Sequence, residues 1–295
     1  MGGLGVLGGL GARRAWGFGE GERLQLGQVI YGSGGGSGGV TGGGNPVPRP
    51  NAIKRLMWEI EKRTSIEVML DAAPVRLGAG GGAELSRHPI LYWAGDRAFP
   101  LPSDEEIGRL RRHLLLGGML LLDSAEGRAG GGFDQSARAL CARLFPRGAG
   151  VGSGSGAAAS SANANGGGGL LRLPEDHVLF RSFYLLRTPV GRVIAQPFLE
   201  AVQHDGRAVI LYSQNDLGGA WARDSYGQWE YDVVPGGDAQ REQAFRLGVN
   251  LAMYALCLDY KTDQVHVPFI MRRRPWQLPP PGAGPAGPGN SEGKP

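Results

Sequence analysis

The stretch that decides the fold is HPILYWAGDRAFPLPSDEEIGRLRRHLLLGGMLLLDSAEG, residues 88–127. It begins with an apolar run, Ile90 to Ala94, that ends at a Gly-Asp turn. Ser103 then stands at the expected N-cap of an amphipathic helix, which a Gly-Gly pair ends before a second apolar run, Met119 to Leu122. Two buried strands joined by one helix form a right-handed βαβ unit, so this segment predicts a parallel sheet.

Elements of the same kinds are expected on both sides of this unit. Before it, a strand is expected within residues 24–31, a helix from Pro50 and a second strand over Ile66 to Leu70. After it come a helix over 133–145, a hairpin of strands 198–203 and 207–213 around an Asp-Gly turn, and a final helix over 240–258. The sequence therefore predicts an α/β fold of the flavodoxin-like class, with a mostly parallel sheet and helices on both faces.

The 53 glycines divide the chain into parts that can and cannot build a core. Residues 1–17 are expected to be a leader or a truncated signal peptide. Residues 18–278 are expected to form a single α/β domain with disordered insertions at 32–44 and 147–169. Residues 279–295 are expected to be a disordered Pro/Gly tail.

The first 17 residues give an indication of the protein's cellular location. Ala15 and Gly17, three and one before Phe18, match a signal-peptidase site, although a leading positive charge is missing. An exported or periplasmic protein is expected. A cytoplasmic protein with a disordered leader is the alternative.

Composition argues against several classes of partner and cofactor. The net charge of +4 is small, and the one dense basic run, Arg272 to Arg274, is short, so nucleic-acid binding is not expected. No run approaches the ~18 apolar residues that a spanning helix needs. Cys141 and Cys257 lack metal-ligand spacing and are interpreted as small buried hydrophobes, so no metal or cofactor is expected.

Three residues are candidates for catalysis. Asp123 and Ser124 follow a predicted strand, where α/β hydrolases place their nucleophile, and His177 stands beside an acidic residue as a candidate base. The segment LLDSAEG lacks the G-x-S-x-G elbow, however. Capping of a turn or helix is the commoner role of an aspartate at such a place.

The predicted ligand site is the carboxyl edge of the sheet. Four polar residues each follow an apolar strand and are expected to meet there, with Arg49 or Arg97 offsetting their charge: Asp96, Asp123, Asn215 and Asp216.

The Gly-rich loop from Ser213 to Trp221 adds an aromatic residue to this site. Together with Tyr226, Trp229 and Tyr231 it would suit a sugar or a peptide. A structured turn that closes the sheet is the alternative.

Four runs carry a resemblance to a known family: RPNAIKRLMWEIEKRTSIEV, residues 88–127, RLPEDHVLFRSFYLL and GRAVILYSQNDLGGAW. In order and spacing they resemble the DUF4159 family, which is similar to class I glutamine amidotransferase and trehalose-utilisation-type α/β domains. Asp123-Ser124 stands where an amidotransferase has its cysteine elbow, and Asn215-Asp216 where the Gly-His of the base is expected. The resemblance therefore implies the fold and an exported, envelope-associated protein, but not amidotransferase chemistry.

These observations favour a non-catalytic binding or scaffold domain associated with the cell envelope. Its partner would be a small ligand or an envelope protein, with peripheral association with the envelope, and the oligomeric state stays open. The alternative is a hydrolase that acts on a sugar or an amide through Asp123, Ser124 and His177.

Overall fold

The computed structural model describes residues 23–31, 47–78, 82–146 and 169–257. The chain divides into two units, Met1–Asp259 and Tyr260–Pro295, and every described residue belongs to the first. The predicted leader, the predicted tail and the two predicted disordered insertions, apart from Gly169, lie outside the described residues.

A seven-stranded sheet runs through the first unit in the order β2-β1-β3-β4-β7-β6-β5. Five strands are parallel: β1 (Gly27–Val29), β2 (Ala73–Val75), β3 (Ile90–Gly95), β4 (Met119–Ser124) and β7 (Arg207–Ser213). Two short strands, β6 (Glu200–His204) and β5 (Leu171–Arg172), complete one side in antiparallel order. The α/β fold with a mostly parallel sheet is confirmed, and so is the parallel pairing of β3 with β4.

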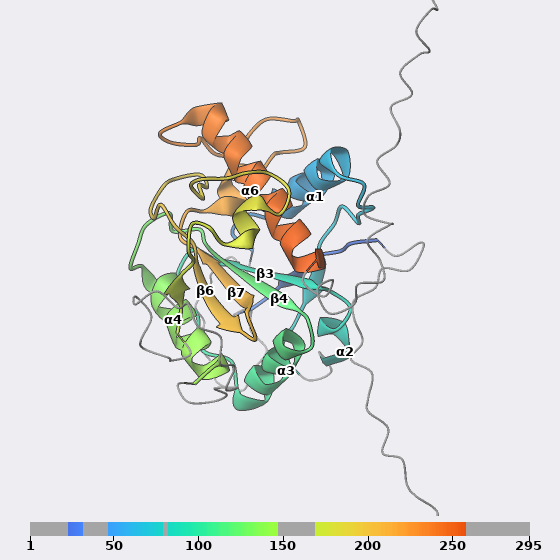
Figure 1. The fold of residues 1–295 in the computed structure, drawn as a ribbon, viewed down its shortest axis with the longest axis vertical. Coiled ribbons are helices and arrows are strands. Elements are labelled where there is room, and N and C mark those ends of the chain that lie inside the picture. Colours follow the sequence, from blue (N-terminus) through green and yellow to red (C-terminus); the bar gives the residue numbers. More distant parts are fainter. Residues whose placement is uncertain (1–22, 32–46, 79–81, 147–168, 258–295) are drawn as a thin grey trace, which may run out of the picture. The chain divides into compact units, whose positions relative to one another are not determined.

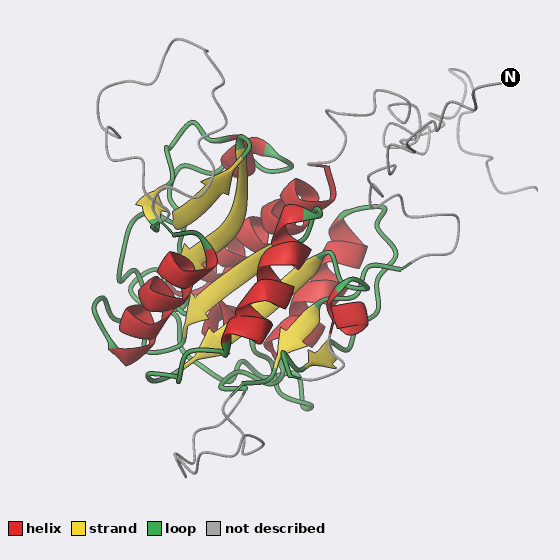
Figure 2. Ribbon diagram, turned by 90° about the horizontal axis from the view of Figure 1, so that it is seen from below, coloured by secondary structure: helices red, strands yellow, loops and turns green. Residues whose placement is uncertain are grey.

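Helices cover both faces of this sheet (Figures 1 and 2). Side chains of α1 (Ala52–Arg63), α5 (Leu217–Trp221) and α6 (Gly237–Cys257) build one core layer together with Leu179 of the 3₁₀ helix η1 (Val178–Arg181). Side chains of α2 (Gly82–Leu85), α3 (Asp104–Leu115) and α4 (Gly132–Leu144) build the other. Successive residues of β3 and β4 alternate between the two layers, which explains why β3 is apolar up to Gly95 and β4 is apolar up to Leu122. No described helix is both long and apolar enough to cross a bilayer.

Local signals place the ends of these elements as expected. Ser103 and Glu106 form a capping box at the start of α3, and Gly117, with φ of 117°, follows its end. In the β6–β7 hairpin, Asp205 and Gly206 have φ of 50° and 74°. Positive φ at both turn residues is what an Asp-Gly hairpin turn requires.

The second strand was predicted at the wrong place. Residues 66–70 contribute only an isolated bridge, between Val68 and Leu24, and the paired strand is β2. Pro74 in the middle of β2 argues against a strand in sequence, but β2 lies at the sheet edge and pairs only with β1, so the missing N–H is tolerated. The first strand is also shorter than the predicted 24–31.

Candidate functional site

The carboxylate of Asp123 lies at the end of β4 and is wholly buried. Its Oδ1 accepts a hydrogen bond from the amide of Leu217 at 2.9 Å, and its Oδ2 accepts from the amide of Gly218 and the hydroxyl of Tyr92, both at 2.8 Å. The two amides belong to the first turn of α5, whose free N–H groups need acceptors. Asp123 therefore joins the end of β4 to the start of α5.

A second buried carboxylate, that of Asp216, completes the start of α5. Its backbone is in the left-handed region, with φ of 53°, and its Oδ1 accepts from the amide of Gly219 at 2.9 Å. Arg49 binds both oxygens, through Nε at 3.1 Å and Nη2 at 2.7 Å, and Arg192 donates to Oδ2. This fork geometry is the strong form of the ion pair, and it fixes Arg49 across the end of the sheet.

The two buried acids influence each other. Burial, followed by the charge of Asp216, raises the pKa of Asp123 to about 6, although the amides of Gly218 and Leu217 and the Tyr92 hydroxyl act in the opposite direction. Burial and the charge of Asp123 raise the pKa of Tyr92 well above its ordinary value. Tyr92 therefore stays protonated and serves as a hydrogen-bond donor.

Asn215 holds a segment, residues 189–196, across the same edge; we call this segment the strap. Its Oδ1 accepts from the amide of Gln196 at 2.9 Å, while its Nδ2 donates to the carbonyls of Gln196 and Pro189 at 2.8 and 3.1 Å. Gly191 passes so close that a Cβ there would lie 2.2 Å from the carbonyl oxygen of Asn215. Gln240 of α6 adds a hydrogen bond to the Gly191 carbonyl at 2.8 Å. The protein's own chain therefore covers the edge at which a ligand was predicted.

The structure brings some predicted ligand residues together and separates others. Asp123 and Asp216 meet at the start of α5, and Arg49, one of the two arginines proposed to offset their charge, binds Asp216. Asp96 pairs instead with its neighbour Arg97, Nε to Oδ1 at 2.9 Å, and no described hydrogen bond links it to the buried acids.

Trp221 lies in the core rather than at a ligand surface. Its side chain is fully buried, and its Nε1 donates to the carbonyl of Ala244 in α6 at 3.0 Å. This tryptophan joins α5 to α6. The polar loop before it is the structured turn considered as the alternative above.

The three candidate catalytic residues do not assemble into a triad. Ser124 is fully buried, and its Oγ has no hydrogen-bond partner among the described residues. The Nδ1 of His177 accepts from the amide of Leu179 at 3.2 Å, so the ring caps η1. Burial lowers the pKa of His177.

The surroundings of His177 place it toward the other end of β7. Its ring packs against Tyr254 at 5.4 Å between centroids, and the Tyr254 hydroxyl accepts from the amide of Ala208 at 2.9 Å. Asp123 is in register with Ser213, five residues farther along the same strand, or about 16 Å at the usual rise. The structure therefore gives the hydrolase interpretation no nucleophile–base pair.

Within the described ranges, no group of three His, Cys, Asp or Glu side chains is arranged to hold a metal ion. Cys141 is buried and Cys257 half-buried, and both are free thiols whose pKa burial raises. Neither is therefore an activated nucleophile.

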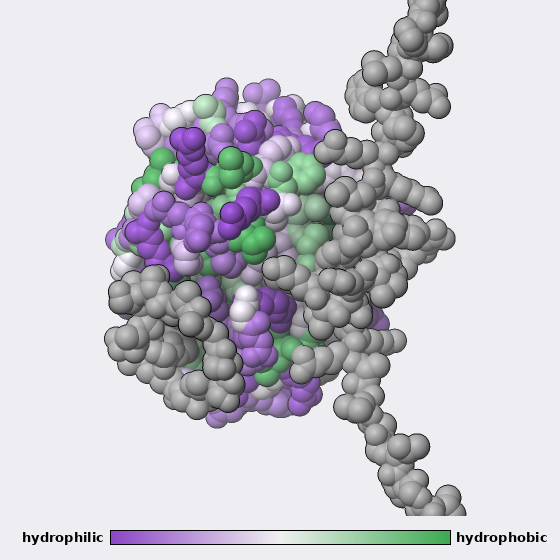
Figure 3. Space-filling view, in the orientation of Figure 1, coloured by the Kyte–Doolittle hydropathy of each residue, from purple (hydrophilic) through white to green (hydrophobic). Residues whose placement is uncertain are grey.

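On the face seen in Figure 3, hydrophilic residues cover most of the described surface, and apolar residues form separate spots. Single exposed apolar residues are ordinary in a folded protein. Apolar area on this face therefore does not indicate a binding surface, whereas hollows lined by polar and aromatic groups can.

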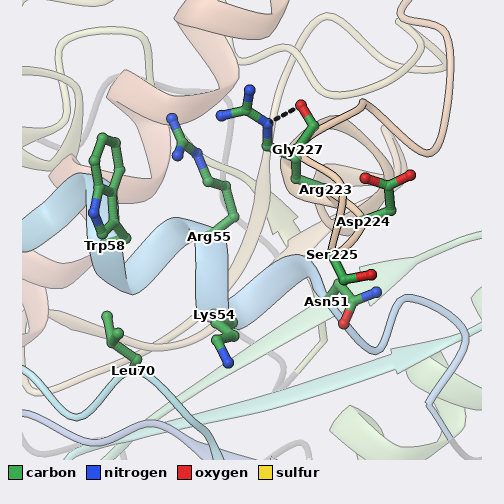
Figure 4. Close-up of a pocket in the computed structure, with 9 residues that line it drawn as sticks. All are labelled: Asn51, Lys54, Arg55, Trp58, Leu70, Arg223, Asp224, Ser225 and Gly227. Atoms are coloured by element: carbon green, nitrogen blue, oxygen red, sulfur yellow. Dashed lines mark hydrogen bonds between the residues drawn. The ribbon is translucent and has the colours of Figure 1, made fainter.

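Two such hollows lie beside α1, and Arg55 lines both. The first, of about 270 Å³, is shown in Figure 4 and is lined by Asn51, Lys54, Arg55, Trp58, Leu70, Arg223, Asp224, Ser225 and Gly227. The second, of about 280 Å³, is lined by Arg55, Glu59, Arg63, Trp229, Asp238, Arg241, Glu242 and Phe245. We call the lining of both hollows the Arg–Trp surface.

Arginine side chains stack on the two tryptophans of this surface. The guanidinium of Arg55 lies 4.0 Å from the ring centroid of Trp58, and those of Arg241 and Arg223 lie 4.2 and 4.9 Å from that of Trp229. The sequence analysis pointed to Trp229 but to no residue of α1 beyond its start. The available signal was the spacing of Arg55 and Trp58, three residues apart on the same helical face.

Comparison with other proteins identifies a family. No curated protein matches this chain. A family model described as a domain of unknown function, DUF4159, matches residues 26–151 and 167–256. The two matched ranges make up well over half of the chain and include nearly all of the described sheet and helices. The chain therefore belongs to the DUF4159 family.

Proposed function

We propose that this chain is a non-catalytic binding domain that takes a small ligand or a protein partner on its Arg–Trp surface. One observation carries the proposal. The polar groups at the carboxyl edge of the sheet are buried and bonded to the chain itself, whereas the two hollows beside α1 lie at the surface. A ligand at the edge would have to displace the strap and both arginine–aspartate contacts.

The fold class can be proposed more finely. The five parallel strands follow the order β2-β1-β3-β4-β7, which corresponds to the 2-1-3-4-5 order of flavodoxin-like domains. This order supports a flavodoxin-like class and, through the resemblance noted above, an amidotransferase-like ancestry. In a domain of this ancestry, the separation of the candidate nucleophile Ser124 from the candidate base His177 favours a binding role over a hydrolytic one.

We also propose that the protein is exported and associates peripherally with the cell envelope. The small residues before Phe18 and the family resemblance support this location. Mass spectrometry of the protein from fractionated cells tests it. An N-terminus at Phe18 in the envelope fraction is expected, while an intact leader in the cytoplasm would contradict it.

Ligand screening on the full chain tests the binding function. We expect a hit from sugars, nucleotides or peptidoglycan fragments to raise the melting temperature, and Trp229→Ala to remove that rise. Leu185→Ala is the matched control, because Leu185 is 80% exposed and lies outside both hollows.

The same screen tests the hydrolase alternative. Each hit is incubated with the protein and followed for turnover. Hydrolysis that Ser124→Ala abolishes would establish the enzyme and contradict the proposal. Binding without turnover supports it.

A further inference from the structure

The first hollow carries more positive than negative charge. Lys54, Arg55 and Arg223 line it, and Asp224 is the one acidic residue among its described lining. Figure 4 shows the guanidinium groups of Arg55 and Arg223 side by side between α1 and the loop that follows α5. After burial, the charge of Arg223 contributes to lowering the pKa of Arg55, as expected for two cations held close together.

The acids near these cations offset little of this charge. Asp224 uses its Oδ1 to accept from the amides of Tyr226 and Gln228, at 3.0 and 2.7 Å, and Figure 4 shows its carboxylate directed away from Arg55. Arg223 donates Nε to the Gly227 carbonyl at 2.6 Å and has no ion pair within the part of the chain that the structure describes.

The other two cations are only partly compensated. Glu59 pairs with both Arg55 and Arg63, and Arg63 pairs in addition with Glu242. Lys54 lies 3.5 Å from Asp71, and both side chains are mostly exposed, which makes this pair weak. Glu230 accepts a hydrogen bond from Asn51 of the lining, and within the described residues no ion pair joins it to these cations. Because Arg223 has no acidic partner there, the lining keeps an excess of positive charge.

This arrangement suits an oxyanion with more than one negative charge. Guanidinium forks recognise carboxylate and phosphate oxygens, and an ammonium adds a point charge. A carboxylate carries one negative charge, whereas a phosphate monoester carries about −1.5 to −2 at pH 7 and offers three acceptor oxygens. Three cations match the phosphate monoester better.

The size and walls of the hollow limit the rest of the ligand. Its volume of about 270 Å³ lies just below the ~300–1,000 Å³ usual for small-molecule sites. The hollow therefore has room for a phosphate group and the small organic group esterified to it. Trp58 and Leu70 provide an apolar wall for that organic group. We propose that the first hollow binds the phosphate monoester of a small molecule, with Arg55, Arg223 and Lys54 holding the phosphate oxygens. This inference rests on the proposed binding function and names its ligand class.

Calorimetric titration of the full chain with glucose 6-phosphate, glycerol 3-phosphate and glucose tests the inference. We expect at least one ester to bind, glucose not to bind, and higher salt to weaken binding. Arg223→Gln should weaken ester binding by at least about tenfold, because a charge-assisted contact is lost. Arg97→Gln changes an exposed arginine that lies outside both hollows and should leave ester binding unchanged.

Two further arms keep the result unambiguous. Lys54→Gln removes a mostly exposed charge and should weaken binding without affecting the fold, in case Arg223→Gln disturbs its loop. Inorganic phosphate should displace the ester, whereas preferential binding of malonate would overturn the phosphate assignment. Equal affinity in Arg223→Gln and the unchanged chain, or no binding of either ester, would also overturn it. If a neutral ligand from the screen still binds and Trp229→Ala abolishes its binding, the proposed binding function of the Arg–Trp surface remains supported without the phosphate assignment.

Discussion

At the scale of single residues, the buried acids at the end of the sheet have structural partners for all their oxygens. Asp123 accepts from two backbone amides and one hydroxyl, and Asp216 accepts from one amide and two guanidinium groups. Truncating such a group leaves buried donors without an acceptor, which costs more than the net contribution of the bonds themselves. These residues should therefore matter for stability before they matter for any ligand.

Asp123→Ala is expected to lower the free energy of unfolding by about 2–4 kcal/mol, because three donors lose their acceptor in a dry environment. Urea denaturation measures the change. Asp96→Ala is the control and should stay within about 0.5 kcal/mol, since among the described residues the ion pair of Asp96 is with exposed Arg97. Equal effects of the two substitutions would contradict the structural role of Asp123.

The raised pKa of Asp123 gives stability a pH dependence. Its folded-state pKa of about 6 exceeds the ordinary 3.8, so between these values the folded protein binds more protons than the unfolded chain. This group's contribution is therefore complete below about pH 4 and is lost as pH rises through 6. Asp123→Asn cannot titrate, and its stability should fall less than that of the unchanged chain between pH 4 and 7. Parallel pH profiles in urea would refute the assignment.

At the scale of elements, two devices hold the architecture: helix caps and the strap. The capping box of Ser103 and Glu106 satisfies amides at the start of α3, with Ser103 Oγ accepting from the Glu106 amide at 3.3 Å and Glu106 Oε2 accepting from the Ser103 amide at 2.8 Å. The strap is held differently, by the buried amide side chains of Asn215 and Gln240 and by close backbone contact at Gly191. The two devices respond to different substitutions.

Ser103→Ala should cost about 1 kcal/mol, the usual effect of losing an N-cap side chain. Thermal and urea denaturation should agree on this value. Ser225→Ala provides the control, because Ser225 is exposed and makes no described side-chain hydrogen bond. A loss of stability in the control as large as in Ser103→Ala would remove the cap as the explanation.

Gly191→Ala should destabilise the protein by about 1–3 kcal/mol, because its Cβ would collide with backbone of Asn215 that cannot easily move. The matched change is Gly108→Ala in α3, where a Cβ meets nothing within 4 Å. It should stabilise by about 0.5–1 kcal/mol through the better helix propensity of alanine. Opposite signs in the two variants are the test, and a stabilising Gly191→Ala would show that the strap is not held closely.

At the scale of the whole molecule, the sequence predicts the scaffold better than the site. Residues 88–127 encode β3, α3 and β4 through local patterns, so their order and parallel pairing could be predicted. The first and second strands could not be bounded, because β1 and β2 are three residues each and take their place from neighbours.

The site depends on side-chain partners far apart in the chain. Asp123 meets Leu217 and Arg49 meets Asp216, and no spacing in the sequence shows that these groups satisfy one another. Burial of the edge by the strap also comes from a segment without regular structure. The Arg–Trp surface was missed for the same reason, since Arg55 of α1 meets Trp229 of the distant segment between α5 and α6.

The difference between central and edge strands predicts which parts of the sheet unfold locally. β3, β4 and β7 are central, six or seven residues long and covered on both faces, whereas β2 and β5 are edge strands of three and two residues. Hydrogen exchange of the full chain, followed by mass spectrometry, should therefore find the slowest amides in β3, β4 and β7 and fast exchange in β2 and β5. If a ligand binds at the Arg–Trp surface, added protection should appear in α1 and residues 222–229 while the central strands stay unchanged. Protection that appears instead at the strap and the start of α5 would return the binding site to the carboxyl edge of the sheet.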